Sequence, residues 1–219
     1  MTELGFECVG VRVEPYAVAP TMAFRVRITD KAAGRDPDGG VHAIALLCQF
    51  RIEPQRRRYS DAEAERLHDL FGDRSRWADT LKPLQFTTVS TVVPAFTDHV
   101  EVDVPVQCTT DLEVAAGRYF HALDGGEVPL LLLFSGSVFA RAGLRYEVTR
   151  IPWSAEASFA LPVERWREMV DRYFPNSGWI PLGRPTLDAL IRYKTERGLP
   201  TWDEVVRTLL ADAATEVLP

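Results

Sequence analysis

Lysine is scarce in this sequence. It supplies only three of the 25 basic residues (Lys31, Lys82 and Lys194), and arginine supplies the other 22. We attribute this bias to a GC-rich coding genome. Acidic residues outnumber basic ones, and the formal net charge is -6 at pH 7. Because binding to nucleic-acid phosphates needs clustered positive charge, this balance argues against nucleic acid as a partner.

The sequence also lacks a long hydrophobic run. Its largest apolar run covers residues 130–134, which is far too short to span a bilayer. Residues 1–10 have no basic start, apolar stretch or small-residue cleavage site of the kind found in secretory signals. We therefore expect a cytoplasmic protein without membrane insertion. A chain of 219 residues with 46% apolar residues can bury a sizeable core without disulfides or metals.

Cysteine is rare as well. Cys8, Cys48 and Cys108 lie tens of residues apart and form no C-x-x-C pair. This spacing argues against both a disulfide framework and a closed zinc site. Each cysteine alternates with apolar neighbours in a strand-like pattern, so we predict buried, reduced thiols.

Common catalytic signatures are missing. The sequence contains no G-x-S-x-G elbow, phosphate loop, G-x-G-x-x-G turn or H-E-x-x-H helix. A metal site would have to be assembled by tertiary structure, because the four histidines are single and scattered: His42, His68, His99 and His121. Glu101 and Asp103 share one face of a predicted strand, where they form either an acid/base pair, a calcium site or a solvated surface. We predict a non-catalytic protein without a cofactor.

Period-two hydrophobic patterns dominate the first 160 residues. In residues 99–108 every second residue is apolar, and Pro105 on the polar face predicts an edge strand. Residues 41–52 are apolar on both faces in their first part, which predicts a central strand covered on both sides. Further strands are expected at residues 9–13, 24–29, 86–93, 128–139, 144–153 and 156–160, with a turn at 140–143. The predicted fold class is α+β, an antiparallel β-sandwich of about eight strands.

A helical insert near residues 60–81 interrupts the strands. Ser60 and Glu63 form an S-x-x-E capping box, so a helix is predicted from Asp61 to a stop at Gly72, and a second helical turn over residues 75–81. Residues 111–123 fit helical spacing before two glycines. We predict helix there, with strand as the alternative.

The last third is helical. Proline and glycine separate three amphipathic patterns, over residues 162–174, 185–197 and from 201 onward. The third begins with a T-x-x-E pairing of Thr201 and Glu204. We predict a β-sandwich over residues 1–160 and a helical segment over 161–219 packed on it, as a single domain.

Candidate binding residues come from one charge run and from the tryptophans. Arginine binds carboxylates in bidentate fashion, so Arg56, Arg57, Arg58 and Tyr59 are predicted to dock an acidic protein surface. The alternative is a charged strand end that blocks edge pairing and bonds the acids of residues 61–65. Four of five tryptophans fall in the last third, as core anchors or as a partner surface. From these we take Trp179 and Trp202 as further protein-binding candidates.

Several segments resemble an uncharacterised bacterial family, a domain of unknown function. They are residues 51–60 (RIEPQRRRYS), 119–123 (YFHAL), 130–136 (LLLLFSG), 173–177 (YFPNS) and 198–202 (GLPTW). The similarity covers nearly the whole chain. Members look like proteins encoded beside NiFe-hydrogenase structural and maturation genes, largely in actinobacteria. The resemblance implies no established activity and carries over no catalytic residue.

Three functional hypotheses follow. The leading one is a non-catalytic accessory or scaffold protein of a NiFe-hydrogenase system, which binds hydrogenase subunits. The second is a chaperone that binds unfolded chains, because SecB-type export chaperones also follow an antiparallel sheet with C-terminal helices and carry a Pro-Asn step like Pro175-Asn176. The third is an enzyme of unrecognised type.

Overall fold

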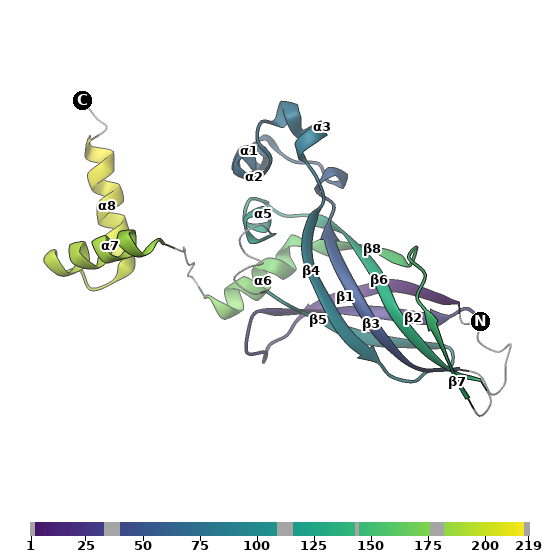
Figure 1. Cartoon of the computed structure of the whole chain (residues 1–219). Helices are drawn as coiled ribbons and strands as arrows, with labels where there is room; N and C mark the ends of the chain where they lie inside the picture. Colours follow the sequence, from purple (N-terminus) through teal and green to yellow (C-terminus); the bar gives the residue numbers. More distant parts are fainter. Residues whose placement is uncertain (1–2, 33–39, 109–115, 143–144, 176–181, 217–219) are drawn as a thin grey trace. The chain divides into compact units, whose positions relative to one another are not determined.

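The chain forms two compact units, Met1–Asn176 and Ser177–Pro219. The computed structural model describes residues 3–32, 40–108, 116–142, 145–175 and 182–216. Within these residues, eight antiparallel strands form two sheets in the first unit, and seven α-helices are distributed over both units (Figure 1). The predicted α+β class and β-sandwich are confirmed. None of the helices in the described ranges is long and apolar enough to cross a membrane.

The smaller sheet has the order β1-β2-β5. Its strands are β1 (Leu4–Val13), β2 (Thr21–Asp30) and β5 (His99–Gln107). β5 lies at the edge, as Pro105 predicted, and Pro105 is opposite Ala23 of β2. Val104 and Val106 are buried on the inner face of β5, while Glu101 lies on its exposed face.

The larger sheet is centred on β3 and β6. Its strands are β4 (Leu84–Val93), β3 (Gly40–Ile52), β6 (Glu127–Ala142), β7 (Arg145–Arg150) and β8 (Glu156–Pro162). β4, β3 and β6 are neighbours in that order, and the two halves of β6 pair with β8 and β7. The predicted turn at residues 140–143 is wrong at its start, because β6 continues through Ala142.

The prediction that β3 is covered on both sides is also wrong. Its side chains alternate between buried and exposed, and Leu47 is 39% exposed on the outer face. The apolar pattern on that face comes mainly from small residues such as Ala45. An irregularity in register between Val41 and Ala43 shifts the alternation at the start of the strand.

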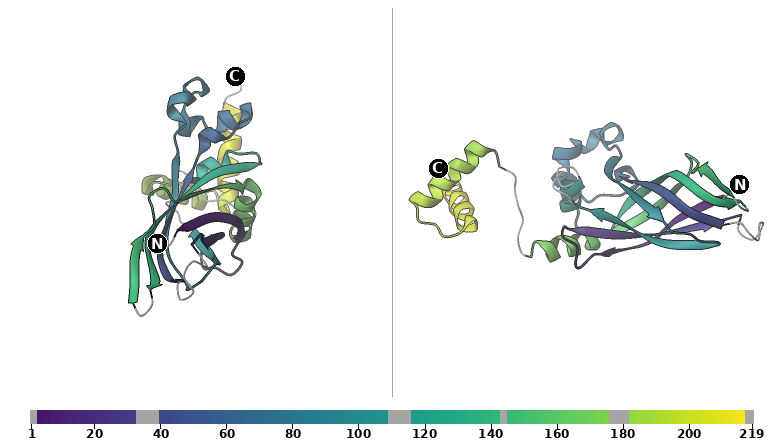
Figure 2. Two further views of the ribbon diagram at one scale, coloured as in Figure 1. Left: turned by 90° about the vertical axis from the view of Figure 1, so that its right-hand side faces the viewer. Right: turned by 60° about the horizontal axis from the view of Figure 1, so that its bottom comes forward.

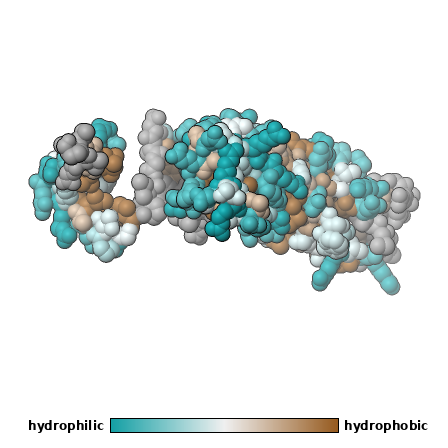
Figure 3. Space-filling view, turned by 90° about the horizontal axis from the view of Figure 1, so that it is seen from above, coloured by the Kyte–Doolittle hydropathy of each residue, from teal (hydrophilic) through white to brown (hydrophobic). Residues whose placement is uncertain are grey.

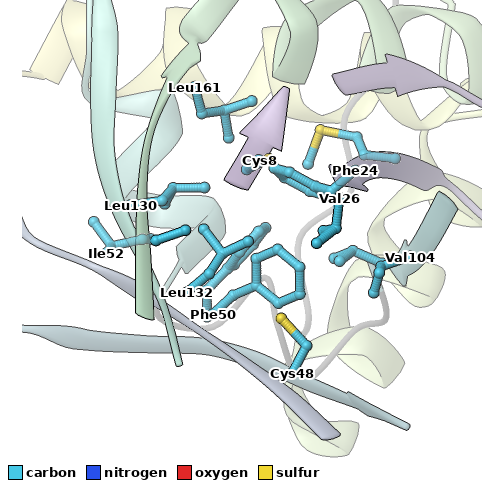
Figure 4. Packing of buried hydrophobic residues seen from close by; sticks show 14 of the residues in the cluster. Cys8, Phe24, Val26, Cys48, Phe50, Ile52, Val104, Leu130, Leu132 and Leu161 are labelled. Carbon is cyan, nitrogen blue, oxygen red and sulfur yellow. The ribbon is translucent and has the colours of Figure 1, made fainter. Parts of the chain in front are cut away.

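The core lies between the two sheets. Side chains from both inner faces point toward one another, for example Phe24 of β2 and Phe50 of β3, whose ring centroids are 4.8 Å apart (Figure 4). Cys8 and Cys48 lie in this core, and Cys108 is buried too, without a disulfide among them. The predicted buried thiols without a disulfide are confirmed, and burial raises the pKa of the Cys8 thiol to about 11.

The helices of the first unit gather at one end of the two sheets (Figures 1 and 2). The insert contains η1 (Pro54–Arg56), α1 (Asp61–Arg66), α2 (His68–Phe71), η2 (Arg74–Arg76) and α3 (Trp77–Thr80). The predicted start at Asp61 and stop at Gly72 are confirmed, and Gly72 has a positive φ of 68°.

Two further helices join the insert to the sheets. They are α5 (Arg118–His121) and α6 (Val163–Tyr173). The rings of Phe120 and Trp166 stack with centroids 4.4 Å apart, which fixes α5 against α6. The helix predicted over residues 111–123 is confirmed at α5, while residues 111–115 lie outside the described residues.

The second unit contains α7 (Arg184–Glu196) and α8 (Trp202–Glu216). The Thr201 hydroxyl accepts a hydrogen bond from the Glu204 N–H at 3.2 Å, which supports the predicted start of the last helix. Among the described residues of this unit only Val205 is fully buried. Figure 3 shows hydrophobic side chains on this pair of helices, and a mainly hydrophilic surface over the insert of the first unit.

Candidate functional site: an arginine cleft beside the helical insert

The loop after β3 is held by a buried carboxylate. Glu53 is 3% exposed, and its Oε1 accepts a hydrogen bond from Arg51 Nη2 at 2.9 Å. Its Oε2 accepts a second from Gln55 Nε2 at 2.5 Å. The Glu53 backbone N–H donates to the carbonyl of Pro129 on β6 at 2.9 Å. Because a buried carboxylate needs such donors, the loop leaves the sheet in a fixed direction.

Arg57 turns inward from this loop. Its side chain is 11% exposed, and its Nη2 donates to Glu63 Oε1 and to the Gly125 carbonyl, each at 2.7 Å. The guanidinium also lies 5.4 Å from the centroid of the Tyr59 ring. Arg57 therefore joins the arginine run to α1 and to the turn before β6. The predicted bond between the run and the acids of residues 61–65 is present.

Glu63 has a second role besides capping α1. Its Oε2 accepts from the Ser60 N–H at 3.0 Å, and the Ser60 hydroxyl accepts from the Glu63 N–H at 3.1 Å, which completes the predicted capping box. Its Oε1 also accepts from the Asp124 N–H at 2.9 Å. Since the side chain is 5% exposed, this single carboxylate ties the start of α1 to a segment about sixty positions later in the chain.

Two tyrosines complete the anchor of the arginine loop, which also contains Arg57 and Glu63. The Tyr59 hydroxyl donates to the Pro54 carbonyl at 2.9 Å and lies 2.7 Å from the Tyr119 hydroxyl, which is then the donor in that bond. Burial raises the pKa of both phenols above the ordinary range. Both are therefore neutral at physiological pH, and the pair serves as a hydrogen-bonded brace rather than as a source of protons.

Arg56 and Arg58 turn outward instead. Both side chains are exposed, and within the described residues neither has a carboxylate within ion-pair distance, whereas Arg57 between them does. They border an open cleft of about 420 Å³. Its other walls come from Glu127 and Pro129 of β6 and from Ser158 and Ala160 of β8.

The structure therefore divides the predicted binding run in two. Arg56 and Arg58 reach solvent at the cleft, while Arg57 and Tyr59 are built into the anchor. Local sequence contained a signal for Glu63, through its capping box. It contained none for the contribution of residues 127–130 and 158–160, because these reach the loop only through sheet pairing.

The two predicted tryptophan candidates belong to the second unit. Trp179 lies outside the described residues. Trp202 is 46% exposed at the start of α8, and Lys194 Nζ lies 5.9 Å from the centroid of its ring. Trp202 is therefore available to a partner on the second unit.

The acidic pair on β5 is engaged by arginines. Asp103 accepts from Arg25 Nε at 3.0 Å and from Arg12 Nη2 at 2.8 Å, and these bonds lower the pKa of its carboxyl group, with Arg25 contributing most. Glu101 accepts from Arg27 Nη2 at 2.8 Å. Both carboxylates thus belong to a surface ion-pair network on the smaller sheet. In the described part of the chain no three His, Cys, Asp or Glu side chains lie close enough to hold a metal ion.

The fold and the site together define an α+β sandwich protein with an exposed arginine cleft, anchored by a buried ion pair. The model of the "Family of unknown function (DUF6084)" matches residues 1–218. The chain therefore belongs to this uncharacterised family. No curated protein matches the chain.

Proposed function

We propose that this protein is a non-catalytic accessory protein that binds an acidic surface of a protein partner through Arg56 and Arg58. The observation that carries the proposal is that these two guanidinium groups are exposed and without an ion-pair partner among the described residues. Arginine is the residue best suited to bidentate recognition of carboxylates. Trp202 offers a second contact on the other unit.

The partner that we propose is a subunit of a NiFe hydrogenase, or its precursor, in the cytoplasm of an actinobacterial host. Support comes from the resemblance to proteins encoded beside hydrogenase genes and from the arginine-rich composition, with 22 arginines against three lysines. The support of the loop favours binding, because little backbone entropy of the loop remains to be lost on association. Arg57, between the two proposed binding arginines, and Tyr59, directly after them, hold the loop in place.

The test is affinity purification of the tagged protein from its native host, beside an Arg56→Glu, Arg58→Glu double variant. Arg57 is left unchanged, because its substitution would break the buried ion pair and confound loss of binding with loss of fold. Recovery of hydrogenase subunits by the parent and a loss of at least about tenfold in the variant are expected.

An Arg76→Glu, Arg150→Glu variant is the matched control. Both residues are exposed and without an ion pair in the described ranges. The two substitutions change the net charge by the same amount as those in the test variant. If this control loses hydrogenase subunits as strongly as the double variant, or if the parent recovers none, the proposal fails.

A second candidate function is that of a SecB-like chaperone. The outer face of the larger sheet exposes Leu47, Val92 and Val148, which are 39%, 72% and 59% exposed. Exposed apolar patches mark surfaces that bind proteins. The test is whether the protein suppresses aggregation of a denatured test protein. Loss of this suppression in a Leu47→Gln, Val92→Thr variant, but not in the Arg56→Glu, Arg58→Glu variant, would favour this function over the first.

A further inference from the structure

We infer that the cleft beside Arg56 and Arg58 is a binding site for an acidic segment of the partner, with one carboxylate side chain inserted between the arginines and β8. This inference rests on the proposed function and adds the chemistry of the ligand. It treats the arginines as one wall of a concave site rather than as a flat charged patch.

The cleft has room because its floor carries short side chains. Ser158 and Ala160 are exposed on the outer face of β8, while Ala157 before them and Leu161 after them are buried in the core. Phe159 also points inward, where its ring lies 5.9 Å from that of Phe24. The volume of about 420 Å³ is within the range of small-ligand pockets and exceeds what a single side chain fills.

The charge of the walls favours a single carboxylate. Arg57 is already neutralised by Glu63, so Arg56 and Arg58 supply the positive charge that a ligand meets. Glu127 on β6 is the acidic residue in the lining. Two positive charges from Arg56 and Arg58 and one negative charge from Glu127 leave a net charge of +1 in the lining. One carboxylate neutralises this charge, whereas a phosphate monoester, with about 1.5 to 2 negative charges, exceeds it.

The apolar part of the lining indicates a peptide rather than a free small acid. Pro129 lies opposite Ala160 in the register of β6 and β8, and together they form an apolar strip next to the arginines. A glutamate or aspartate flanked by small apolar residues matches both parts of this surface. Binding then combines charge-assisted hydrogen bonds with burial of apolar area.

The test is fluorescence anisotropy with the purified protein and a short labelled peptide in which glutamate alternates with alanine. The same peptide with glutamine in place of glutamate is expected to bind at least about tenfold more weakly. Arg56→Glu with Arg58→Glu should abolish binding, and Arg76→Glu with Arg150→Glu should leave it within about twofold. Glu127→Gln should tighten binding by about twofold to fivefold, because it removes the repulsive charge.

Ala160→Phe distinguishes binding inside the cleft from binding to the exposed arginines alone. It fills the floor while leaving all three arginines in place, so a loss of about tenfold or more is expected. Ser90→Phe, an exposed position on the outer face of β4, is the control for adding a phenyl ring to the same sheet. Thermal unfolding of both variants shows whether the fold is kept.

Equal binding of the glutamate and glutamine peptides, or full binding by Ala160→Phe, would overturn the inference. So would displacement of the peptide by inorganic phosphate or a single-stranded RNA oligonucleotide at equal charge concentration. If hydrogenase subunits co-purify through Arg56 and Arg58 but the peptide does not bind, the proposed function stands and the cleft inference fails. If the peptide binds through the cleft and no hydrogenase subunit co-purifies, the hydrogenase proposal fails alone.

Discussion

A buried guanidinium holds three segments of the first unit together. Arg57 contacts Glu63 at the start of α1, the Gly125 carbonyl before β6 and the ring of Tyr59. Removing one partner of a buried ion pair leaves the other charge uncompensated, which costs more than the pair itself contributes.

Arg57→Met is expected to lower the free energy of unfolding by about 3 kcal/mol, because it removes the cation that pairs with the buried Glu63 carboxylate. Arg165→Met is the control, since Arg165 pairs with the exposed Glu168 on the surface of α6. That change should cost no more than about 0.5 kcal/mol. Equal midpoints of the two variants in urea unfolding would contradict the role given to Arg57.

Asp103 makes stability depend on acid pH. Its pKa is lowered by Arg25 first and by Arg12 next, so the folded carboxylate stays charged where the unfolded one is already protonated. The stabilisation is therefore fully present above the unfolded pKa of about 3.9 and is lost as the pH falls through the lower folded pKa. Asp103→Asn should lower the thermal midpoint at pH 7 and make no difference near pH 2.

Thermal unfolding followed by circular dichroism over that pH range measures the difference in thermal midpoint between parent and variant. Asp69→Asn, an exposed carboxylate of α2 without an ion pair among the described residues, should show no such difference at either pH. If the difference in thermal midpoint between Asp103→Asn and the parent is the same near pH 2 as at pH 7, the ion pairs are not its cause.

At the scale of elements, the close approach of β3 and β6 depends on one glycine. Gly136 has a φ of 137°, and a Cβ at this position would lie 2.0 Å from the carbonyl oxygen of Ala45. That oxygen belongs to the backbone of the central strand, so it cannot move without disturbing the ladder.

Gly136→Ala is expected to cost about 3 kcal/mol or more, through both the clash and the positive φ. Gly10→Ala on β1 is the matched control, because nothing lies within 4 Å of the added methyl group. It should change stability by no more than about 1 kcal/mol. Chemical denaturation compares the two, and similar losses would show that strand glycines matter here only through entropy.

Elements with a local signal were predictable, and those that depend on distant partners were not. Alternation along residues 99–108 and Pro105 were enough for an edge strand, and Ser60 with Glu63 was enough for a helix start. The exposure of Leu47 was not predictable, because an apolar residue on a strand does not report whether another layer covers it.

The candidate site shows the same limit. The arginine run was visible in the sequence, but its division into outward and inward side chains follows from Glu63 and the Gly125 carbonyl. The floor of the cleft comes from β8, about one hundred positions after the arginines. Only tertiary structure brings these parts together.

At the scale of the whole molecule, nearly all fully buried side chains among the described residues belong to the first unit. In the described residues of the second unit only Val205 is buried. A pair of helices with so small a core falls below the size at which a chain folds without staples or partners.

A chain ending at Asn176 is therefore expected to unfold cooperatively, with a midpoint within a few degrees of that of the parent. Residues 177–219 alone should show little stable helix by circular dichroism. Loss of the cooperative transition in the shorter chain would mean that α7 and α8 are needed for the sandwich to fold.

The alternation in the arginine loop has a consequence for how the family can diversify. The side chains at positions 57 and 59 hold the loop, whereas those at positions 56 and 58 are exposed and without an ion pair among the described residues. Substitutions at the outer two positions are therefore expected to leave the stability of the loop unchanged. If the proposed binding is correct, partner preference can change at these two positions while the inner two keep the loop in place.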